Sequence, residues 1–171
     1  IVFTMVSTGK DLQQVLFQAD GLLADPSRTP AILVDCSTVS PEESQDIREA
    51  AVAAGTEMLV VPVSGNDVVA RARKLNVIAS GPRIVFETVK PYLGCFGPSA
   101  TYVGEGDTSR IVKIGHNLLL GIVFQGLAET TVLAEKSGIP RHVYLEVINN
   151  SVLGSTFSRY RSPTMVNLDF T

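Results

Sequence analysis

The sequence is poor in several residue types, and each shortage narrows the class of protein. It has no tryptophan, two histidines and two cysteines, and charged residues make up only 18% of its 171 positions. The net charge is −3, whereas proteins that bind the phosphate backbone of nucleic acids carry an excess of basic residues. We therefore expect no nucleic-acid partner. Apolar residues, at 45%, are enough to fill a globular core. A small-molecule ligand fits this composition better.

Cysteine spacing and hydropathy narrow the class further. Cys36 and Cys95 lie far apart, without a CxxC pair or a histidine at ligand spacing. This argues against a zinc site or a disulfide framework, so we expect no metal and two buried thiols. The sequence also lacks a run of about 20 unbroken apolar residues and a basic leader with a cleavage site. We therefore expect no membrane partner and a cytoplasmic protein.

The chain starts directly on the strand-like run IVFTMV and stops without a closing element, which predicts an internal piece of a longer protein. Four more short, β-branched runs follow. Their nearly continuous apolarity is typical of strands that are covered on both faces. The five strands are expected at 1–6, 31–36, 57–63, 75–80 and 101–104.

Helical patterns lie between the first three runs. Residues 40–55 begin with Ser40 as N-cap and Pro41 at the first helical position, and apolar spacing predicts another helix over 10–24. This alternation predicts the α/β class with a parallel, Rossmann-type sheet. The glycine fingerprint G-x-G-x-x-G is absent, so either the fold is different or its first half is missing.

The pattern changes after residue 107, where strand-like runs stop. Continuous helical periodicity predicts one long, buried helix over 108–136, and a further helix is expected over 140–154. We therefore expect an α/β part over 1–104, the second half of a Rossmann domain, and the start of an all-helical part over 105–171.

Lys113 and Asn117 are four residues apart in the expected long helix, so they share a helix face with Cβ atoms about 6 Å apart. Apolar neighbours lower the pKa of such a lysine, which suits it to donate and recover a proton, and the amide can orient the substrate. The alternative is a solvated lysine beside a surface asparagine. His116 lies on a neighbouring stripe, and a lone histidine is more often structural.

Two small polar motifs follow strands. VPVSGND at 61–67 brings Ser64 and Gly65 to the carboxyl end of a strand, where parallel sheets bind ligands and backbone N–H groups are open to a carboxylate. DCSTVSP at 35–41 brings Thr38 to the same edge, as an anion or ribose contact. The alternatives are an ordinary turn and an ordinary N-cap.

In this order the motifs resemble those of the β-hydroxyacid dehydrogenases, the 3-hydroxyisobutyrate dehydrogenase family with its 6-phosphogluconate dehydrogenase-like domain. VVPVSGN at 60–66 is similar to the substrate motif D-x-P-V-S-G-G, and GEGDTSRIVKIGHN at 104–117 to the catalytic motif G-x-G-x-x-x-K-x-x-N-N. TMVS at 4–7 and VDCSTVSP at 34–41 are similar to T-M-L-P and V-D-x-S-T-x-x-P. The resemblance covers nearly the whole chain.

The resemblance implies hydride transfer between NAD or NADP and a small β-hydroxy acid or its semialdehyde or keto form. It also implies a homo-oligomer, such as a dimer. The site residues that it implies are Lys113 as general acid and base, Ser64, Gly65, Asn66 and Asn117 for the substrate, and Val6, Ser7 and Thr38 for the cofactor.

Some positions depart from the family motifs. In the substrate motif, Val60 replaces the aspartate, Asn66 replaces the second glycine and Arg73 replaces a glycine that usually follows. In the first motif, Ser7 replaces the turn proline. In the catalytic motif, six residues separate Gly106 from Lys113. No specific substrate is therefore carried over. Two alternatives stay open: an imine-reductase-like enzyme, which generally has another residue in place of the lysine, and a non-catalytic dehydrogenase-like module that binds or dimerises. Because the pyrophosphate fingerprint is absent, we expect this piece alone to be inactive.

Overall fold

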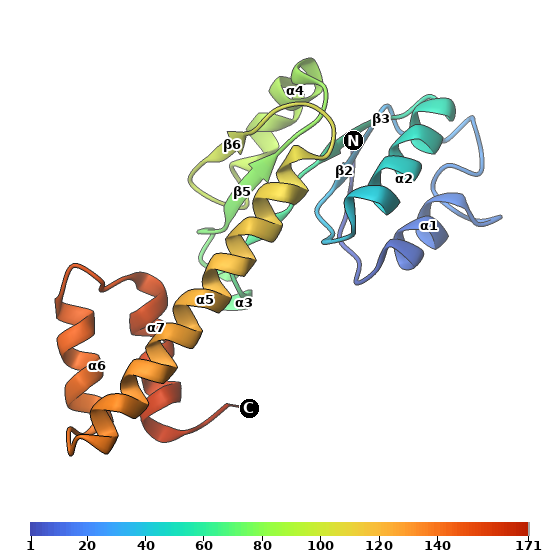
Figure 1. Ribbon diagram of the computed structural model, residues 1–171. Helices are drawn as coiled ribbons and strands as arrows, with labels where there is room; N and C mark the ends of the chain where they lie inside the picture. Colours follow the sequence, from blue (N-terminus) through green and yellow to red (C-terminus); the bar gives the residue numbers. More distant parts are fainter. Residues whose placement is uncertain (171) are drawn as a thin grey trace. The chain divides into compact units, whose positions relative to one another are not determined.

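A computed structural model describes residues 1–170 of the chain (Figure 1). The chain forms two compact units, Ile1–Gly115 and a second unit that begins at His116. Helix α5 (Thr108–Lys136) begins in the first unit and continues in the second.

The first unit contains two three-stranded sheets. In one, β1 (Val2–Thr4), β2 (Ile32–Asp35) and β3 (Glu57–Val60) lie in this order and are parallel. In the other, β5 (Asn76–Ala79) pairs antiparallel with β4 (Val63–Ser64) and parallel with β6 (Ala100–Tyr102). An antiparallel bridge between Val60 and Ser80 joins the two sheets. The predicted parallel α/β sheet is confirmed, and β4 adds an antiparallel strand.

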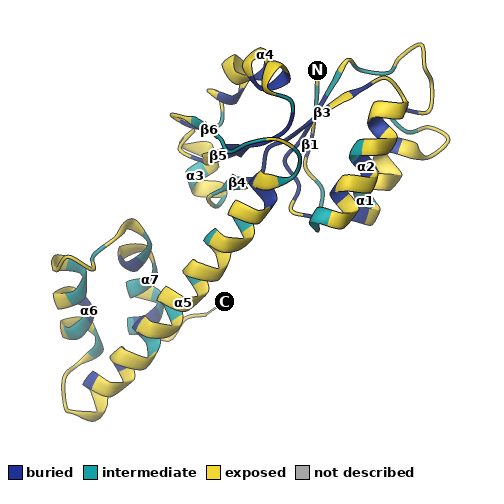
Figure 2. Ribbon diagram, turned by 45° about the horizontal axis from the view of Figure 1, so that its top comes forward, coloured by how far each residue is buried: buried dark blue, intermediate teal, exposed yellow. Residues whose placement is uncertain are grey.

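Helices cover both faces of the first sheet, which explains why β2 and β3 are apolar at most of their positions. Successive residues of a strand point to opposite faces. On β2, Leu33 packs with α1 (Gly9–Phe17) and α2 (Pro41–Ala53), whereas Val34 packs with α4 (Arg83–Leu93). Figure 2 shows β3 as largely buried and much of the outer surface of α1 and α2 as exposed.

The predicted beginning of α2 is confirmed in detail. Ser40 Oγ accepts a hydrogen bond from the Glu43 backbone N–H at 3.2 Å, and Glu43 Oε2 accepts one from the Ser40 N–H at 3.2 Å. This reciprocal pair is a capping box, followed by Pro41 in the first turn. It fixes the point where the chain leaves β2 and enters the helix.

The first predicted helix is shorter than expected, because α1 ends at Phe17 instead of continuing to residue 24. The chain then turns back on the helix: the Leu22 N–H donates to Val15 O at 2.9 Å, and the Leu23 N–H donates to Leu16 O at 2.8 Å. Leu23 is buried in the same core as the helix. The spacing of Leu23 in the sequence fits a helix, although the residue lies in a turn and its side chain reaches the core from there.

The expected elements omit α4 and α7 (Thr156–Asn167). Helix α4 has Pro82 at its N-cap position, makes no side-chain cap and contains Pro91, so the usual start signal is missing. Helix α7 also contains a proline, Pro163. In both cases a proline inside the helix obscures the periodic pattern.

The second unit is helical. Leu127 on α5 forms a small core with Leu145 on α6 (Arg141–Asn150) and Met165 on α7. The predicted limits of the long helix are confirmed. The prediction that it is buried is wrong for this chain, because only part of its surface meets the other helices and side chains such as Leu118 and Ile122 remain 65% and 59% exposed.

By length and composition, α5 is a candidate membrane span. An 18-residue window within it has a mean hydropathy of 1.5, and 6% of that window is buried in the structure. The core helix of a soluble protein meets the same criterion, and α5 carries Arg110, Lys113 and Glu129 along its length.

Candidate functional site

The loops that follow β1 and β2 lie at one edge of the first sheet. These strands are parallel neighbours, so their carboxyl ends meet at the edge where such sheets bind ligands. The Val6 N–H donates to Ser37 Oγ at 3.0 Å, which joins the two loops. Ser7 and Thr38, predicted to contact a cofactor, are exposed in these two loops.

Asp35, the last residue of β2, is the centre of this edge. It is fully buried, and its Oδ1 accepts hydrogen bonds from Thr4 Oγ1 at 2.9 Å and from Ser37 Oγ at 2.7 Å. The Ser37 N–H lies within 3.3 Å of the same oxygen. A buried carboxylate needs this many donors, because burial removes its water.

Arg110 supplies the opposite charge from the first turn of α5. Only 2% of its surface is exposed, its Nη2 donates to Asp35 Oδ2 at 2.6 Å, and its Nη1 donates to Ser37 O at 2.6 Å. Its Nε lies 3.6 Å from Asp107 Oδ1. Asp107 in turn accepts hydrogen bonds from Ser44 and Arg48 on α2. The beginning of α5 is therefore tied to β2 and to α2 by charged groups.

A pair of serines adds a second attachment of α5 to the sheet. Ser109 Oγ donates to Val60 O at 3.1 Å, and Ser80 Oγ donates to Gly106 O at 2.8 Å. The two hydroxyl oxygens lie 2.7 Å apart, and the Ser109 N–H donates to Ser80 Oγ at 3.1 Å. The first turn of α5 is thus fixed to the carboxyl ends of both β3 and β5.

Lys113 lies one helical turn beyond Arg110 and is half-buried. Burial lowers the pKa of its ammonium group, because a charged amine loses water contacts. The predicted direction of this pKa shift is confirmed. A lysine with a lowered pKa can exchange a proton with a bound substrate more readily than a solvated one.

Asn117 lies one further turn along α5, at the spacing that gives it the same helix face as Lys113. It is exposed, and its Oδ1 lies 3.3 Å from His116 Nδ1. His116 therefore interacts with the amide that was predicted to orient the substrate.

The predicted substrate motif Ser64-Gly65-Asn66 follows β4. Gly65 has a φ of +143°, a backbone conformation that favours glycine, and a Cβ placed there would lie 2.6 Å from Leu75 Cδ2. The Asn66 Oδ1 accepts a hydrogen bond from the Val69 N–H at 3.0 Å and caps the short helix α3 (Asp67–Arg71). The side chain that replaces the family's glycine is thus engaged in the turn itself.

The two thiols differ in their surroundings. Cys36 is buried beside Asp35, and burial together with that carboxylate raises the pKa of its thiol to about 12. Cys95 is exposed in the turn after α4, so the prediction of two buried thiols is wrong for Cys95. Among the described residues, no cluster of histidine, cysteine and acidic side chains could hold a metal ion.

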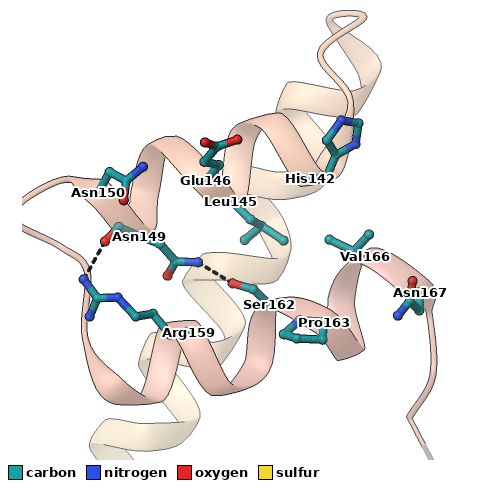
Figure 3. A pocket seen from close by; sticks show the side chains of 10 residues that line it. All are labelled: His142, Leu145, Glu146, Asn149, Asn150, Arg159, Ser162, Pro163, Val166 and Asn167. Atoms are coloured by element: carbon teal, nitrogen blue, oxygen red, sulfur yellow. Dashed lines mark hydrogen bonds between the residues drawn. The ribbon is translucent and has the colours of Figure 1, made fainter.

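The second unit has a groove of about 470 Å³ between α6 and α7 (Figure 3). Its polar groups bond to one another: Asn149 Nδ2 donates to Ser162 Oγ at 2.8 Å, and Arg159 Nη2 donates to Asn149 O at 2.7 Å. None of the predicted site residues lines this groove. These bonds hold α6 to α7.

The sequence reasoning missed Asp35 and Arg110 as a pair. An acidic residue at the end of a buried strand and a cation in an apolar helix are each signals of a buried partner. The two residues are 75 positions apart, so no spacing rule could have joined them.

Comparison with known proteins relates the first unit to a family of NAD binding domains. Residues 1–104 match the family model of the NAD binding domain of 6-phosphogluconate dehydrogenase. The chain is 36% identical over 155 residues to 3-hydroxyisobutyrate dehydrogenase of Pseudomonas aeruginosa, covering 91% of this chain and 52% of that protein. It is 32% identical over 171 residues to L-threonate dehydrogenase of Escherichia coli, covering 99% and 56%. The chain thus spans about half the length of the curated relatives it matches.

Solved structures of related proteins also match the chain over nearly its whole length. A crystal structure of 3-hydroxyisobutyrate dehydrogenase from Salmonella typhimurium matches with a TM-score of 0.84 at 30% identity, over 99% of this chain and 59% of that chain. A structure of Psf3 in complex with NADP⁺ and 2-OPP matches with a TM-score of 0.84 at 25% identity, over 96% and 58%.

Proposed function

Because the chain belongs to the β-hydroxyacid dehydrogenase family, we propose that the full-length protein is an NAD(P)-dependent oxidoreductase. It transfers a hydride between the nicotinamide and a small β-hydroxy acid or the corresponding semialdehyde or keto form. The observation that carries this proposal is Lys113, a half-buried lysine with a lowered pKa, one turn beyond a helix start that is anchored at the cofactor edge.

The cofactor edge fits the nicotinamide-ribose side of a dinucleotide. Exposed Ser7 and Thr38 offer hydroxyl groups at the carboxyl ends of two adjacent parallel strands, and Val6 lies beside them. When bound, the cofactor supplies the hydride donor or acceptor. The chain's own residues position it.

Lys113 acts as general acid and base in this proposal. During reduction of the carbonyl form, its ammonium group gives a proton to the substrate oxygen, and during oxidation the neutral amine removes that proton. Asn117, on the same helix face, orients the substrate. Its amide serves this purpose because it does not compete for the proton.

Ser64, Gly65 and Asn66 bind the substrate carboxylate. The backbone N–H groups of a glycine turn can approach an anion closely, because Gly65 has no side chain that would block the approach. The named activities of the relatives support a small hydroxy acid: one is a 3-hydroxyisobutyrate dehydrogenase and another an L-threonate dehydrogenase. The two named substrates differ, so the class is proposed and not one acid.

We also propose a cytoplasmic homo-oligomer in which a second copy covers the exposed apolar side of α5. Leu118, Leu119, Ile122 and Leu133 are each about 60% exposed or more. Contiguous apolar surface of this kind marks protein or membrane contacts. The charged Lys113 and Glu129 on the same helix favour protein over lipid as the cover.

The experiment is an activity assay on the full-length protein that contains this chain. NAD and NADP are each combined with a panel of short β-hydroxy acids, including 3-hydroxyisobutyrate and L-threonate, and the absorbance of the reduced nicotinamide is followed. We expect turnover of at least one acid, and a fall of about 100-fold or more with Lys113→Ala. Lys136→Ala, at the far end of the same helix, is the matched control and leaves the rate unchanged.

The same assay separates the alternatives. A non-catalytic module would bind dinucleotide, seen by titration, yet would oxidise no acid. An imine-reductase-like enzyme would reduce a cyclic imine and spare hydroxy acids. Lys113 favours the dehydrogenase, because a titrating amine suits proton transfer to a carbonyl oxygen.

A further inference from the structure

The carboxylate of Asp35 and the guanidinium of Arg110 join three segments of the first unit. These segments are the end of β1, through Thr4, the loop after β2, through Ser37, and the first turn of α5. We propose that Asp35 and Arg110 are positioning residues for hydride transfer, which fix Lys113 relative to the loops that carry the cofactor contacts. This inference rests on the function proposed above.

The contacts of Asp35 and Arg110 connect the loops proposed to bind the cofactor with the helix that carries the proposed general base, Lys113. Asp35 Oδ1 holds Ser37 Oγ, which accepts the Val6 N–H and so joins the loop after β1. Asp35 Oδ2 holds Arg110, from which Lys113 is three residues, or about one helical turn, away. A continuous chain of hydrogen bonds therefore runs from the backbone of the cofactor loop to the helix of the general base.

The two hydrogen bonds of Arg110 restrict the orientation of its guanidinium group as well as its position. Arg110 donates through Nη1 to the Ser37 carbonyl and through Nη2 to the Asp35 carboxylate, both at 2.6 Å. Two donors from one planar group fix its orientation as well as its distance. At 2% and 0% side-chain exposure, neither partner is loosened by competing water.

The anchorage by Arg110 differs from the other attachments of α5. Ser109 ties the helix to β3, and Asp107 ties it to α2 through Arg48. Arg110 reaches the loop after β2, where Thr38 lies exposed at the cofactor edge. Removal of the pair therefore leaves the helix start attached while its relation to that loop becomes less defined.

Positioning of this kind affects the rate more than binding. A displacement of about 1 Å at a reacting group can reduce the rate about 100-fold while the substrate still binds. The loss should therefore fall mainly on kcat, because the carboxylate contacts proposed for Ser64, Gly65 and Asn66 do not depend on Arg110.

The test uses the full-length protein with Asp35→Asn and Arg110→Met combined, so that no buried charge lacks a partner. We expect a folded protein with a nearly unchanged KM for the acid and a kcat lower by about 100-fold. A second variant, Arg110→Lys, keeps the charge but not the two-pronged donor, so its kcat should lie between those of the double variant and the wild type.

Arg48→Met is the matched control, because it loosens α5 from α2 and leaves Asp35 and Arg110 paired. A kcat in Arg48→Met as low as in the double variant would overturn the inference, since loosening of α5 would then be a general effect. A wild-type kcat in Arg110→Lys, or in the folded double variant, would overturn it while the proposed function stands. Absence of turnover in the wild type would overturn both.

Discussion

Arg110 Nη2 lies 2.6 Å from Asp35 Oδ2, although the two residues are 75 positions apart in the chain. The pair joins the last residue of β2 to the first turn of α5 within the first unit. A buried ion pair is weak support for stability as a whole, but the loss of one partner alone leaves an uncompensated charge in the core.

Arg110→Met on its own should therefore destabilise the protein by about 3–5 kcal/mol. The cause is the Asp35 carboxylate, which keeps its serine and threonine donors but loses its counter-ion. Urea unfolding of the single and the double variant gives the comparison, and the double variant should recover most of the loss. A single variant as stable as wild type would contradict the expected cost of separating this buried pair.

The activity should depend on pH through Lys113. Burial lowers the pKa of its ammonium group below the usual 10.5, and oxidation of the hydroxy acid needs the neutral amine. The oxidation rate should therefore rise with pH and level off above that lowered pKa, whereas the reduction rate should fall over the same range. Rate profiles of wild type and Lys136→Ala should coincide, and an oxidation rate that falls with rising pH would exclude this role.

The two thiols should react at very different rates. Cys36 is buried and the pKa of its thiol is raised to about 12, so at neutral pH almost none of it is the reactive thiolate. Cys95 is exposed and should be alkylated by iodoacetamide in the folded protein. Mass spectrometry of the labelled peptides provides the measurement. Rapid labelling of Cys36 in Cys95→Ser would contradict the packing around β2.

Polar substitutions on the exposed side of α5 should separate the subunits. Leu118→Gln and Ile122→Gln remove apolar surface that is 65% and 59% exposed in this chain, so folding of the single chain should change by no more than about 0.5 kcal/mol. Light scattering should report a smaller species for the double variant. Val143→Gln, at an exposed position on α6, serves as the comparison and should leave the mass unchanged.

Local signals in the sequence were sufficient for much of the fold. The capping box of Ser40 and Glu43 and the extent of α5 depend on neighbouring residues alone, and both form as such patterns predict. Leu22 and Leu23 show the limit of periodicity, because a turn places them in the core where a helix was expected. Pro82 and Pro91 hide α4 for a related reason, since propensity disfavours a helix that packing stabilises.

In the candidate site, too, some residues could be predicted from local sequence and others depend on tertiary packing. The spacing of Lys113 from Asn117 and its apolar neighbours are properties of one helix, and together with the order of the family motifs they led to its prediction as general acid and base. Asp35 and Arg110 meet only after β2 and α5 have packed, so their relation is a product of the tertiary fold and has no counterpart in a motif. The exposure of Cys95 likewise depends on where a turn lies, which composition does not specify.

The exposed apolar side of α5 has a consequence for stability under the proposal that a second copy covers it. If a second copy covers Leu118 and Ile122, folding and association are linked by mass action, and the melting temperature rises with protein concentration. A protein that is stable in a concentrated stock would then be less stable, with its anchored Lys113, when it is diluted for assay.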